Sequence, residues 1–358
     1  MVLNPARRIT LRPWMVVLVL CTIYLAVILI HYNRGVMELV FPTPSGDKGY
    51  DGQFTYYIAL DPANAVPRLD VPAYRYQRIL HPALARLLSL GQEPLVSWTM
   101  LSINLAALAI GTAAFEQLLI AERVSRWYAL VYGLFGGVFF AVRVSTSEPL
   151  AYGLAILAIL AGQRNHLTWQ TVWLALAALA KETTLFFVAG YLVYYVLEWR
   201  WRDLIRLALI GLAPFVLWQA ILTLWLGQPG LGSGGAMATP FEIIPFNGIW
   251  RLSEFGLSAL LVFGLLPILS VLLPTLWALW RGLRDLFQRH WHPYVFLMLA
   301  NAAIMPFVPF STYREPLGIA RFATGLVIGV VLYAALRKSR RALRYSTLWI
   351  LFGARLLG

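Results

Sequence analysis

Long apolar stretches recur along most of this chain, and they limit what it can fold into more than any other feature. Stretches of about 18 or more apolar residues are typical of helices that cross a lipid bilayer. The 358 residues are 60% hydrophobic and 13% charged, with a mean hydropathy of +0.69. A soluble domain is about a quarter charged and cannot bury this much apolar surface in one core. The sequence therefore predicts an all-α polytopic membrane protein, with residues 1–358 forming a single domain.

The apolar stretches divide into about ten expected transmembrane helices. The first follows a basic segment but has no small-residue cleavage site after it, so we interpret it as a retained span. A last apolar piece, 346–358, is short, and both a membrane-crossing and an interfacial helix remain open for it. The ten expected spans cover residues 14–30, 95–120, 128–142, 150–162, 167–180, 185–197, 207–226, 255–280, 294–310 and 317–336.

Basic residues gather in alternate connections between the expected spans. With ten spans, all of these connections lie on one side, which the positive-inside rule assigns to the cytoplasm. Both termini are then cytoplasmic, whereas the first long loop (31–93) and a Gly/Pro-rich loop (227–250) face outward. The net charge of +13 is explained by orientation, since no single basic stripe for nucleic acid exists. The orienting residues are Arg7, Arg8, Arg12, Arg123, Arg126, Arg164, Arg200, Arg202, Arg206, Arg281, Arg284, Arg289, Arg337, Lys338, Arg340, Arg341 and Arg344.

The first outward loop contains an acidic and aromatic cluster, "GYDGQFTYYIALDP" at 49–62. Asp51 lies between two glycines that permit tight turns, and the residues after it suit a short interfacial helix. One interpretation is a site around Asp51. The alternatives are that Asp51 caps a helix and that the tyrosines belong to an interfacial aromatic belt. The polar neighbours of Asp51 in this cluster are Tyr50, Gln53, Tyr56 and Tyr57.

A second interfacial helix is expected from Arg75, in "RYQRILHPALARLLSLG". Its leucines and isoleucine form one apolar face, which leaves Arg75 and Arg78 available to water, to lipid headgroups or to a bound phosphate. Together with the helix after Asp51, it is expected to form a roof over a cavity at membrane level.

Other charged residues fall near the outer ends of expected spans. Glu148 precedes a proline, which also suits a plain helix start. Lys181 and Glu182 separate two short spans; charges at this depth are functional candidates, although a local ion pair at a turn is the alternative. Arg321 lies about a turn and a half into the last span and follows Arg314; an interfacial snorkelling arginine is the alternative there.

An outward carboxylate and several cations around a membrane-level pocket suit the transfer of a group from a lipid-linked phosphate. The cations bind the departing phosphate, and the carboxylate accepts a proton from the incoming hydroxyl. The sequence has no glycine-rich loop for a nucleotide phosphate. Few charges fall within spans and no internal repeat is evident, which disfavours a lipid-glycan flippase or transporter. That class and a non-catalytic subunit of a membrane complex remain the alternatives.

Four segments resemble the GT-C superfamily of multi-pass glycosyltransferases, in particular a bacterial branch of membrane proteins linked to cell-surface glycopolymer formation. The resemblance covers about residues 10–200, with "STYREPLGIARF" beyond. It implies an inverting enzyme of the bacterial inner membrane that transfers a sugar from a polyprenyl-phosphate donor to a lipid-linked or cell-surface glycan. The segments are "YDGQFTYYIALDP", "PAYRYQRILHPALARLL", "TSEPLAYGLAILAIL" and "LALAALAKETTLFF".

The resemblance also implies roles for individual residues. Asp51 is the expected general base. No cofactor is expected; a divalent metal is not preferred, because no second acid directly adjoins Asp51 and Asp47 is only close to it. The expected phosphate contacts are Lys181, Arg314, Arg321, Arg75 and Arg78, and the expected acceptor-binding or architectural residues are Tyr50, Gln53, Tyr56, Tyr57, Glu148 and Glu182.

Overall fold

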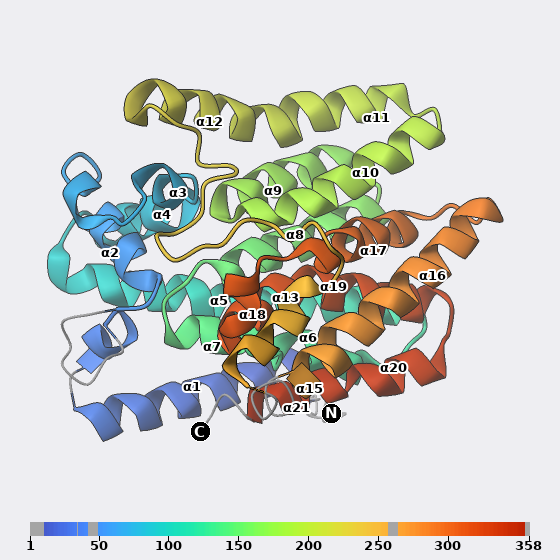
Figure 1. Cartoon of the computed structure of the whole chain (residues 1–358), viewed down its shortest axis with the longest axis horizontal. Helices are drawn as coiled ribbons and strands as arrows, with labels where there is room; N and C mark the ends of the chain where they lie inside the picture. The colour runs from blue at the N-terminus through green and yellow to red at the C-terminus, as the bar shows by residue number, and fades with distance from the viewer. Residues whose placement is uncertain (1–10, 34, 42–48, 257–263, 355–358) are drawn as a thin grey trace, which may run out of the picture.

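The computed structural model describes residues 11–33, 35–41, 49–256 and 264–354, and these ranges are helical with no β-strand. Most of the longer helices lie side by side in one bundle (Figure 1). The predicted all-α class is therefore confirmed. Three residues that entered the sequence predictions, Arg7, Arg8 and Asp47, and part of the expected span 255–280 lie outside the described ranges.

Five described helical segments are long and apolar enough to cross a membrane, which supports a membrane protein. This is fewer than the ten expected spans, because several expected spans are helices of 10–17 residues, shorter than a bilayer crossing usually needs. The five long segments are Pro13–Tyr32 (α1), Glu93–Ala121 (α5), Trp201–Leu226, Leu265–Phe287 and Pro316–Leu336 (α19). The shorter apolar segments are Glu148–Gln163 (α8), Leu167–Ala180 (α9), Glu182–Leu197 and Pro293–Phe307.

Two of the long segments are interrupted by π-helical turns. Each turn ends just before a proline, at Pro214 and at Pro274, because proline lacks an N–H and displaces the carbonyl one turn earlier. The pieces of these and of the shorter composite segments are α11 (Trp201–Arg206), η5 (Leu207–Leu212), α12 (Ala213–Leu226), α15 (Leu265–Pro267), η8 (Ile268–Leu272), α16 (Leu273–Phe287), η4 (Glu182–Thr184), α10 (Leu185–Leu197), α17 (Pro293–Ala303) and η9 (Met305–Phe307).

Proline and glycine mark several helix ends as the physics of helix termini predicts. Pro13, Pro149 and Pro316 lie in the first turns of α1, α8 and α19, where a missing N–H needs no partner. Gly227 follows α12 with φ of +77°, a left-handed conformation that glycine adopts without strain.

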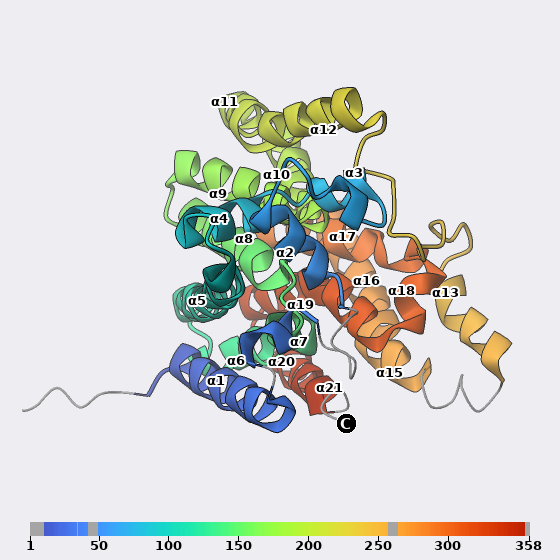
Figure 2. The ribbon, with the colours of Figure 1, turned by 90° about the vertical axis from the view of Figure 1, so that its left-hand side faces the viewer.

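Short helices cover one end of the bundle, and Figure 2 looks onto this end with α2 near its centre. The helix expected from Arg75 is broken here: one helix ends at Tyr76 and the next begins at Leu80. Pro82 lies in the first turn of the second helix, which is where proline fits. The short helices from the first loop are η1 (Gly35–Leu39), α2 (Gly52–Leu60), η2 (Val66–Arg68), α3 (Pro72–Tyr76) and α4 (Leu80–Ser89).

Helix α19 lies at the centre of the bundle. Of its most apolar 18-residue window 83% is buried, against 22% for α1 on the outside. It packs against α17 and α7, and a Cβ on Gly137 would lie 2.3 Å from the carbonyl oxygen of Ala320, so this contact requires glycine. The remaining described elements are η3 (Arg126–Ala129), α6 (Leu130–Gly133), α7 (Gly136–Arg143), α13 (Asn247–Trp250), η6 (Arg251–Phe255), α18 (Phe310–Arg314), α20 (Arg340–Ser346) and α21 (Leu348–Ala354).

Three basic turns lie at one end of the bundle. The turns between α10 and α11, between α16 and α17 and between α19 and α20 lie together at the end opposite α2, α3 and α4 (Figure 1). These turns and their flanks carry three of the basic clusters that alternate along the sequence. Their common position agrees with the alternation on which the predicted topology depends.

Candidate functional site

The start of α2 is held against the turn that precedes α8. A Cβ on Gly52 would lie 2.2 Å from the carbonyl oxygen of Val144, so only glycine allows this approach. The turn itself contains Ser145 in a left-handed conformation, with φ of +52°. This packing places Asp51, at the N-terminus of α2, beside the first residues of α8. The Asp51 side chain makes no capping hydrogen bond to α2, so the helix-cap alternative is wrong.

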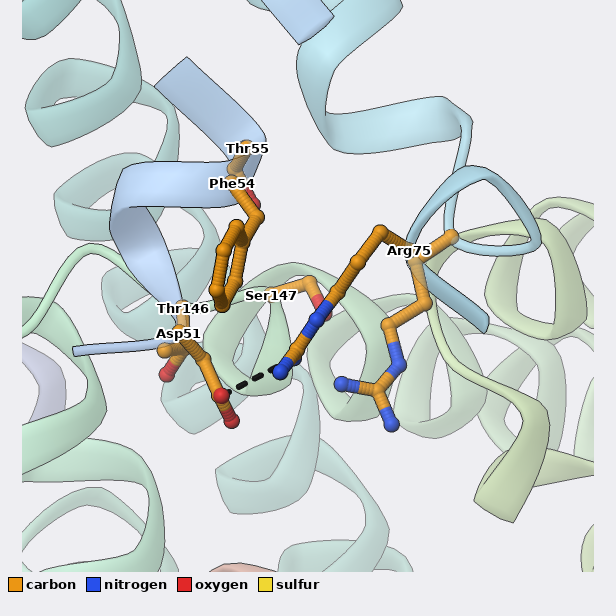
Figure 3. A pocket seen from close by; sticks show the side chains of 7 residues that line it. Asp51, Phe54, Thr55, Arg75, Thr146 and Ser147 are labelled. Carbon is orange, nitrogen blue, oxygen red and sulfur yellow. Dashed lines mark hydrogen bonds and ion pairs between the residues drawn. The ribbon is translucent and has the colours of Figure 1, made fainter. Parts of the chain in front are cut away.

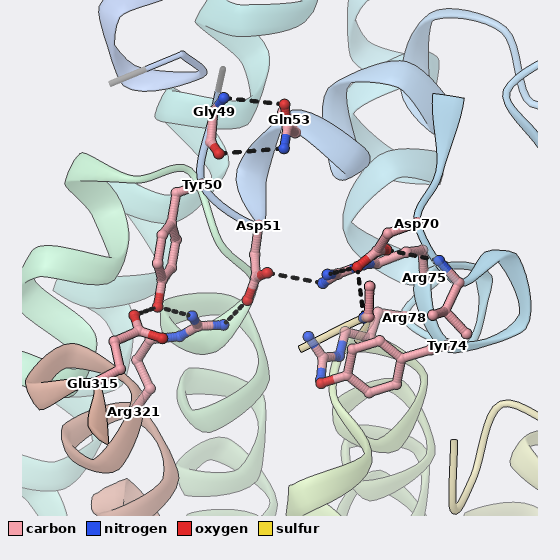
Figure 4. Close-up of polar contacts among 12 residues, drawn as sticks. Gly49, Tyr50, Asp51, Gln53, Asp70, Tyr74, Arg75, Arg78, Glu315 and Arg321 are labelled. Atoms are coloured by element: carbon pink, nitrogen blue, oxygen red, sulfur yellow. Dashed lines mark hydrogen bonds and ion pairs between the residues drawn. The ribbon is translucent and has the colours of Figure 1, made fainter. Parts of the chain in front are cut away.

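The carboxylate of Asp51 bridges two arginines from distant parts of the chain (Figure 4). Nη1 of Arg75 lies 2.9 Å from Oδ1, and Nη2 of Arg321 lies 2.9 Å from Oδ2. The side chain of Asp51 is 30% exposed, whereas both arginine side chains are 7% exposed. Neither arginine therefore snorkels to a headgroup region, which excludes the alternatives raised for them. Asp51 is the accessible member of a buried charge cluster.

Each of these arginines also has a second carboxylate. Nε of Arg75 donates to Asp70 over 2.7 Å, and Nε of Arg321 donates to Glu148 over 2.5 Å. Glu148 in turn accepts from Nζ of Lys181, also over 2.5 Å. Acids and bases thus alternate in one continuous series, which we call the ion chain: Asp70, Arg75, Asp51, Arg321, Glu148 and Lys181.

Arg78 and Glu182 form a separate buried pair beside the ion chain. Nη2 and Nε of Arg78 lie 2.5 and 2.9 Å from the Glu182 carboxylate, and Nη2 also donates to the Tyr74 hydroxyl over 2.6 Å. Within the described part of the chain, Nη1 of Arg78 makes no hydrogen bond. One alternative was that Lys181 and Glu182 pair with each other. They do not, because Glu182 pairs with Arg78 and Lys181 pairs with Glu148. Arg78 retains donors for a ligand.

A small cavity opens at this point (Figure 3). Its volume is about 280 Å³ counting the open mouth. Arg321 and Lys181 do not line it, because Arg321 contacts Asp51 from the side opposite Arg75 (Figure 4). The wall thus offers two guanidinium groups, several hydroxyls and one carboxylate, which suits an oxyanion next to a hydroxyl-bearing molecule. The lining residues are Asp51, Phe54, Thr55, Arg75, Arg78, Thr146 and Ser147.

The surroundings of Asp51 keep it ionised. Burial raises the pKa of the Asp51 carboxyl, but Arg321 and Arg75 lower it by more, so its pKa lies well below the usual value. Burial lowers the pKa of Arg75, but the hydrogen bond to Asp70 and the charge of Asp51 together outweigh burial, so its pKa is raised. A carboxylate held in this way is a weak base until one of its arginines is engaged elsewhere.

The depressed pKa of Asp51 predicts a particular dependence of stability on pH. Because its folded-state pKa lies below the unfolded value of about 3.9, its contribution is complete above about pH 5 and is lost as pH falls through the folded-state pKa. We expect the difference in thermal unfolding temperature between wild type and Asp51→Asn to stay constant from about pH 8 to about pH 5 and to shrink below about pH 4. Intrinsic fluorescence in detergent measures it, and a difference lost already at about pH 6 would contradict the ion pairs.

The site includes Tyr50 but excludes several other predicted residues. The Tyr50 hydroxyl accepts from Nη1 of Arg321 over 2.7 Å and donates to Glu315 (Figure 4). Gln53 bonds only the backbone of Gly49 among the described contacts. Arg314 is exposed, with no ion pair to any described residue.

The two tyrosines of α2 point elsewhere. Tyr56 is 4% exposed and its hydroxyl lies 3.3 Å from Glu93, so this residue is not in an exposed aromatic belt. The ring of Tyr57 faces the guanidinium of Arg68, which is 5.4 Å from the ring centroid. Neither residue lines the cavity, and their expected acceptor-binding role has no geometric support.

The site also contains residues to which the sequence analysis gave no role. Asp70 and Glu315 anchor Arg75 and Tyr50, and Tyr74 contacts Arg78. Thr146 and Ser147 line the cavity, and their place directly before Glu148 was the one available signal. Tyr50 and Glu315 are 265 positions apart, and nothing in the sequence pattern indicates that they pair.

The donor set around Asp51 suits anions better than a metal ion. Guanidinium groups occupy both of its oxygens and would repel a cation. Among the described residues, no group of three or more His, Cys, Asp or Glu side chains has an arrangement that could hold a metal.

Comparisons with known proteins found no counterpart. No family model matches the chain, and no curated protein and no solved structure matches it either. The resemblance to GT-C glycosyltransferases therefore stays a prediction, and the function has to be argued from the geometry of the site.

Proposed function

We propose that this protein is an inverting GT-C-type glycosyltransferase that moves a sugar from a polyprenyl-phosphate donor to a lipid-linked or cell-surface glycan. One observation carries the proposal: the carboxylate of Asp51 lies between Arg75 and Arg321, at a cavity that Arg78 also lines. A base and phosphate-binding cations thus share one small space. The surrounding apolar helices supply a lipid environment for an isoprenoid tail.

In this proposal the donor phosphate binds Nη1 of Arg78 and the Nη atoms of Arg75 through charge-assisted hydrogen bonds. Its negative charge competes with Asp51 for these guanidinium groups. Asp51 then loses part of its stabilisation, its pKa rises, and it becomes a better base. The reaction needs this exchange, because in the resting state both carboxylate oxygens are occupied by arginines.

The chemical step is a single displacement. The acceptor hydroxyl oxygen forms a bond to the anomeric carbon, and the bond from that carbon to the phosphate oxygen breaks. Asp51 takes the hydroxyl proton, and polyprenyl phosphate leaves with the bonding electron pair while the arginines stabilise its charge. Attack opposite the leaving group inverts the anomeric configuration.

We further propose that the site faces the outside of the bacterial plasma membrane. The five long segments, the four shorter apolar segments and α6–α7 together would give ten spans with both termini cytoplasmic. The basic turns at the end opposite α2 support this orientation through the positive-inside rule.

A donor panel tests this proposal. Protein in nanodiscs is given polyprenyl-phosphate sugars labelled in the sugar, with a glycolipid extract as acceptor. We expect label in the acceptor, one released polyprenyl phosphate per sugar, and inverted anomeric configuration by NMR. Asp51→Asn prepared identically controls for contaminating enzymes. Equal transfer by both proteins would show that a contaminating enzyme, or a base other than Asp51, makes the product. No transfer by either, while the wild type moves the glycolipid across a vesicle membrane, would favour the flippase alternative.

A further inference from the structure

The carboxylate of Glu148 is buried, so its charge has to be compensated by other residues of the protein. Glu148 is the first residue of α8, and its side chain is fully buried. A buried carboxylate is costly unless it is paired and hydrogen-bonded. No glycan acceptor can reach it without rearrangement of the chain, so its expected acceptor-binding role has no geometric support.

One oxygen of Glu148 holds two cations. Oε1 accepts from Nζ of Lys181, which follows α9, and from Nε of Arg321 on α19, both over 2.5 Å. Lys181 is itself 5% exposed and does not line the cavity. Its position is that of a counter-ion to Glu148, outside the lining of the cavity where a phosphate would meet Arg75 and Arg78.

The contact between Glu148 and Arg321 fixes the orientation of the Arg321 guanidinium group as well as compensating its charge. A guanidinium group is planar and rigid, so holding Nε decides where both Nη atoms point. With Nε on Glu148, Nη1 reaches the Tyr50 hydroxyl at 2.7 Å and Nη2 reaches Asp51 at 2.9 Å. The orientation of Asp51 thus depends on Glu148 through Arg321.

We infer that Glu148 is a positioning residue, which directs Arg321 onto Asp51, and that Lys181 neutralises Glu148 without binding the donor phosphate. This inference rests on the proposed function for its kinetic consequence, but its structural consequence stands independently. Glu148 touches no reacting atom, and its effect on transfer passes through the orientation of the base.

Hydrogen exchange and kinetics of four variants test the inference. The variants are Glu148→Gln, Lys181→Met, the double variant Glu148→Gln/Lys181→Met, and the control Glu198→Gln, which changes an exposed acid at the end of α10. The double variant removes both charges of a buried pair, so it keeps the site neutral where a single change could prevent folding.

We expect the amides of residues 50–54 to exchange at least about tenfold faster in Glu148→Gln and in the double variant, because Asp51 loses a fixed anchor. In the control they exchange at the wild-type rate. In Lys181→Met any faster exchange is expected to be shared by the whole bundle and not to be concentrated in residues 50–54, because the loss of a buried partner destabilises the fold as a whole. For transfer, kcat falls about 100-fold in the double variant while the donor KM changes little, since Arg75 and Arg78 remain in the cavity.

Other results would overturn the inference. If the double variant folds and restores wild-type exchange and kcat, Glu148 serves only to pair with Lys181. If Lys181→Met raises the donor KM about tenfold with kcat unchanged, Lys181 binds phosphate. If no donor supports transfer by the wild type, the proposed function fails, and the exchange rates still decide whether Glu148 positions Asp51.

Discussion

Asp51→Asn is expected to lower the rate of sugar transfer about 1,000-fold, which is within the usual contribution of a general base. The amide has nearly the same size as the carboxylate, but its one oxygen can accept in place from only one of the two arginines, and it cannot take the acceptor proton. The loss is therefore expected in kcat. The matched control is Asp61→Asn at the other end of α2, where the carboxylate contacts Asn64 outside the cavity.

The same variant is expected to bind a phosphate-bearing lipid more tightly than the wild type. In the wild type, phosphate has to compete with a carboxylate that makes charge-assisted bonds to two guanidinium groups. A neutral amide competes less, and the gain is expected to be about tenfold to 100-fold in affinity. Farnesyl phosphate titrated into nanodisc-embedded protein and followed by calorimetry measures this. Weaker binding by Asp51→Asn would show that Asp51 holds the donor instead of competing with it.

Arg321→Leu is expected to destabilise the fold by about 3–5 kcal/mol, the usual result of removing one member of a buried ion pair. Glu148 would keep only Lys181 as a partner, and Asp51 would keep only Arg75. Equilibrium unfolding in mixed micelles measures the change in the free energy of unfolding. A loss below about 1 kcal/mol would mean that the ion chain is not maintained in the membrane.

Arg314→Leu is the matched control, because Arg314 is an exposed arginine at the end of α18, just before α19 begins. Its effect on stability is expected to stay within about 0.5 kcal/mol, as for most exposed positions. Arg321→Lys adds a second comparison. A lysine keeps the charge but cannot reach Glu148, Tyr50 and Asp51 with one rigid fork, so we expect partial recovery of stability.

The elements of the fold were largely predictable because local chemistry determines them. Apolar composition predicts helices in a bilayer, and prolines at the starts of α1, α8 and α19 lie where the sequence pattern places helix starts. The shorter spans stay predictions. Hydropathy predicts that a segment is buried, but it does not distinguish a membrane crossing from a buried helix of 14–16 residues such as α8 or α9.

The charged residues of the site were predictable as a set. A charge in apolar surroundings needs a partner, and this argument selects Lys181, Glu182 and Arg321. Asp51 was selected from the acidic cluster of the first loop, and Glu148 from its place at a helix start. Their pairing was not predictable, because it depends on how α8, α9 and α19 pack. Glu148 and Arg321 are 173 positions apart, and no periodicity relates two residues at such a separation. Arg314 was also selected and does not join the cluster, since it ends the separate helix α18 and its side chain is exposed.

The order in which the chain is made adds a constraint of its own. Asp51 is synthesised 270 residues before Arg321, and Glu148 meets Lys181 long before it meets that arginine. Asp51 and Glu148 are thus both synthesised before their shared partner, Arg321. That partner comes with α19, which lies in the middle of helices synthesised earlier. The ion chain is therefore complete only after α19 has been synthesised, and synthesis of the first loop, which carries Asp51, is not sufficient.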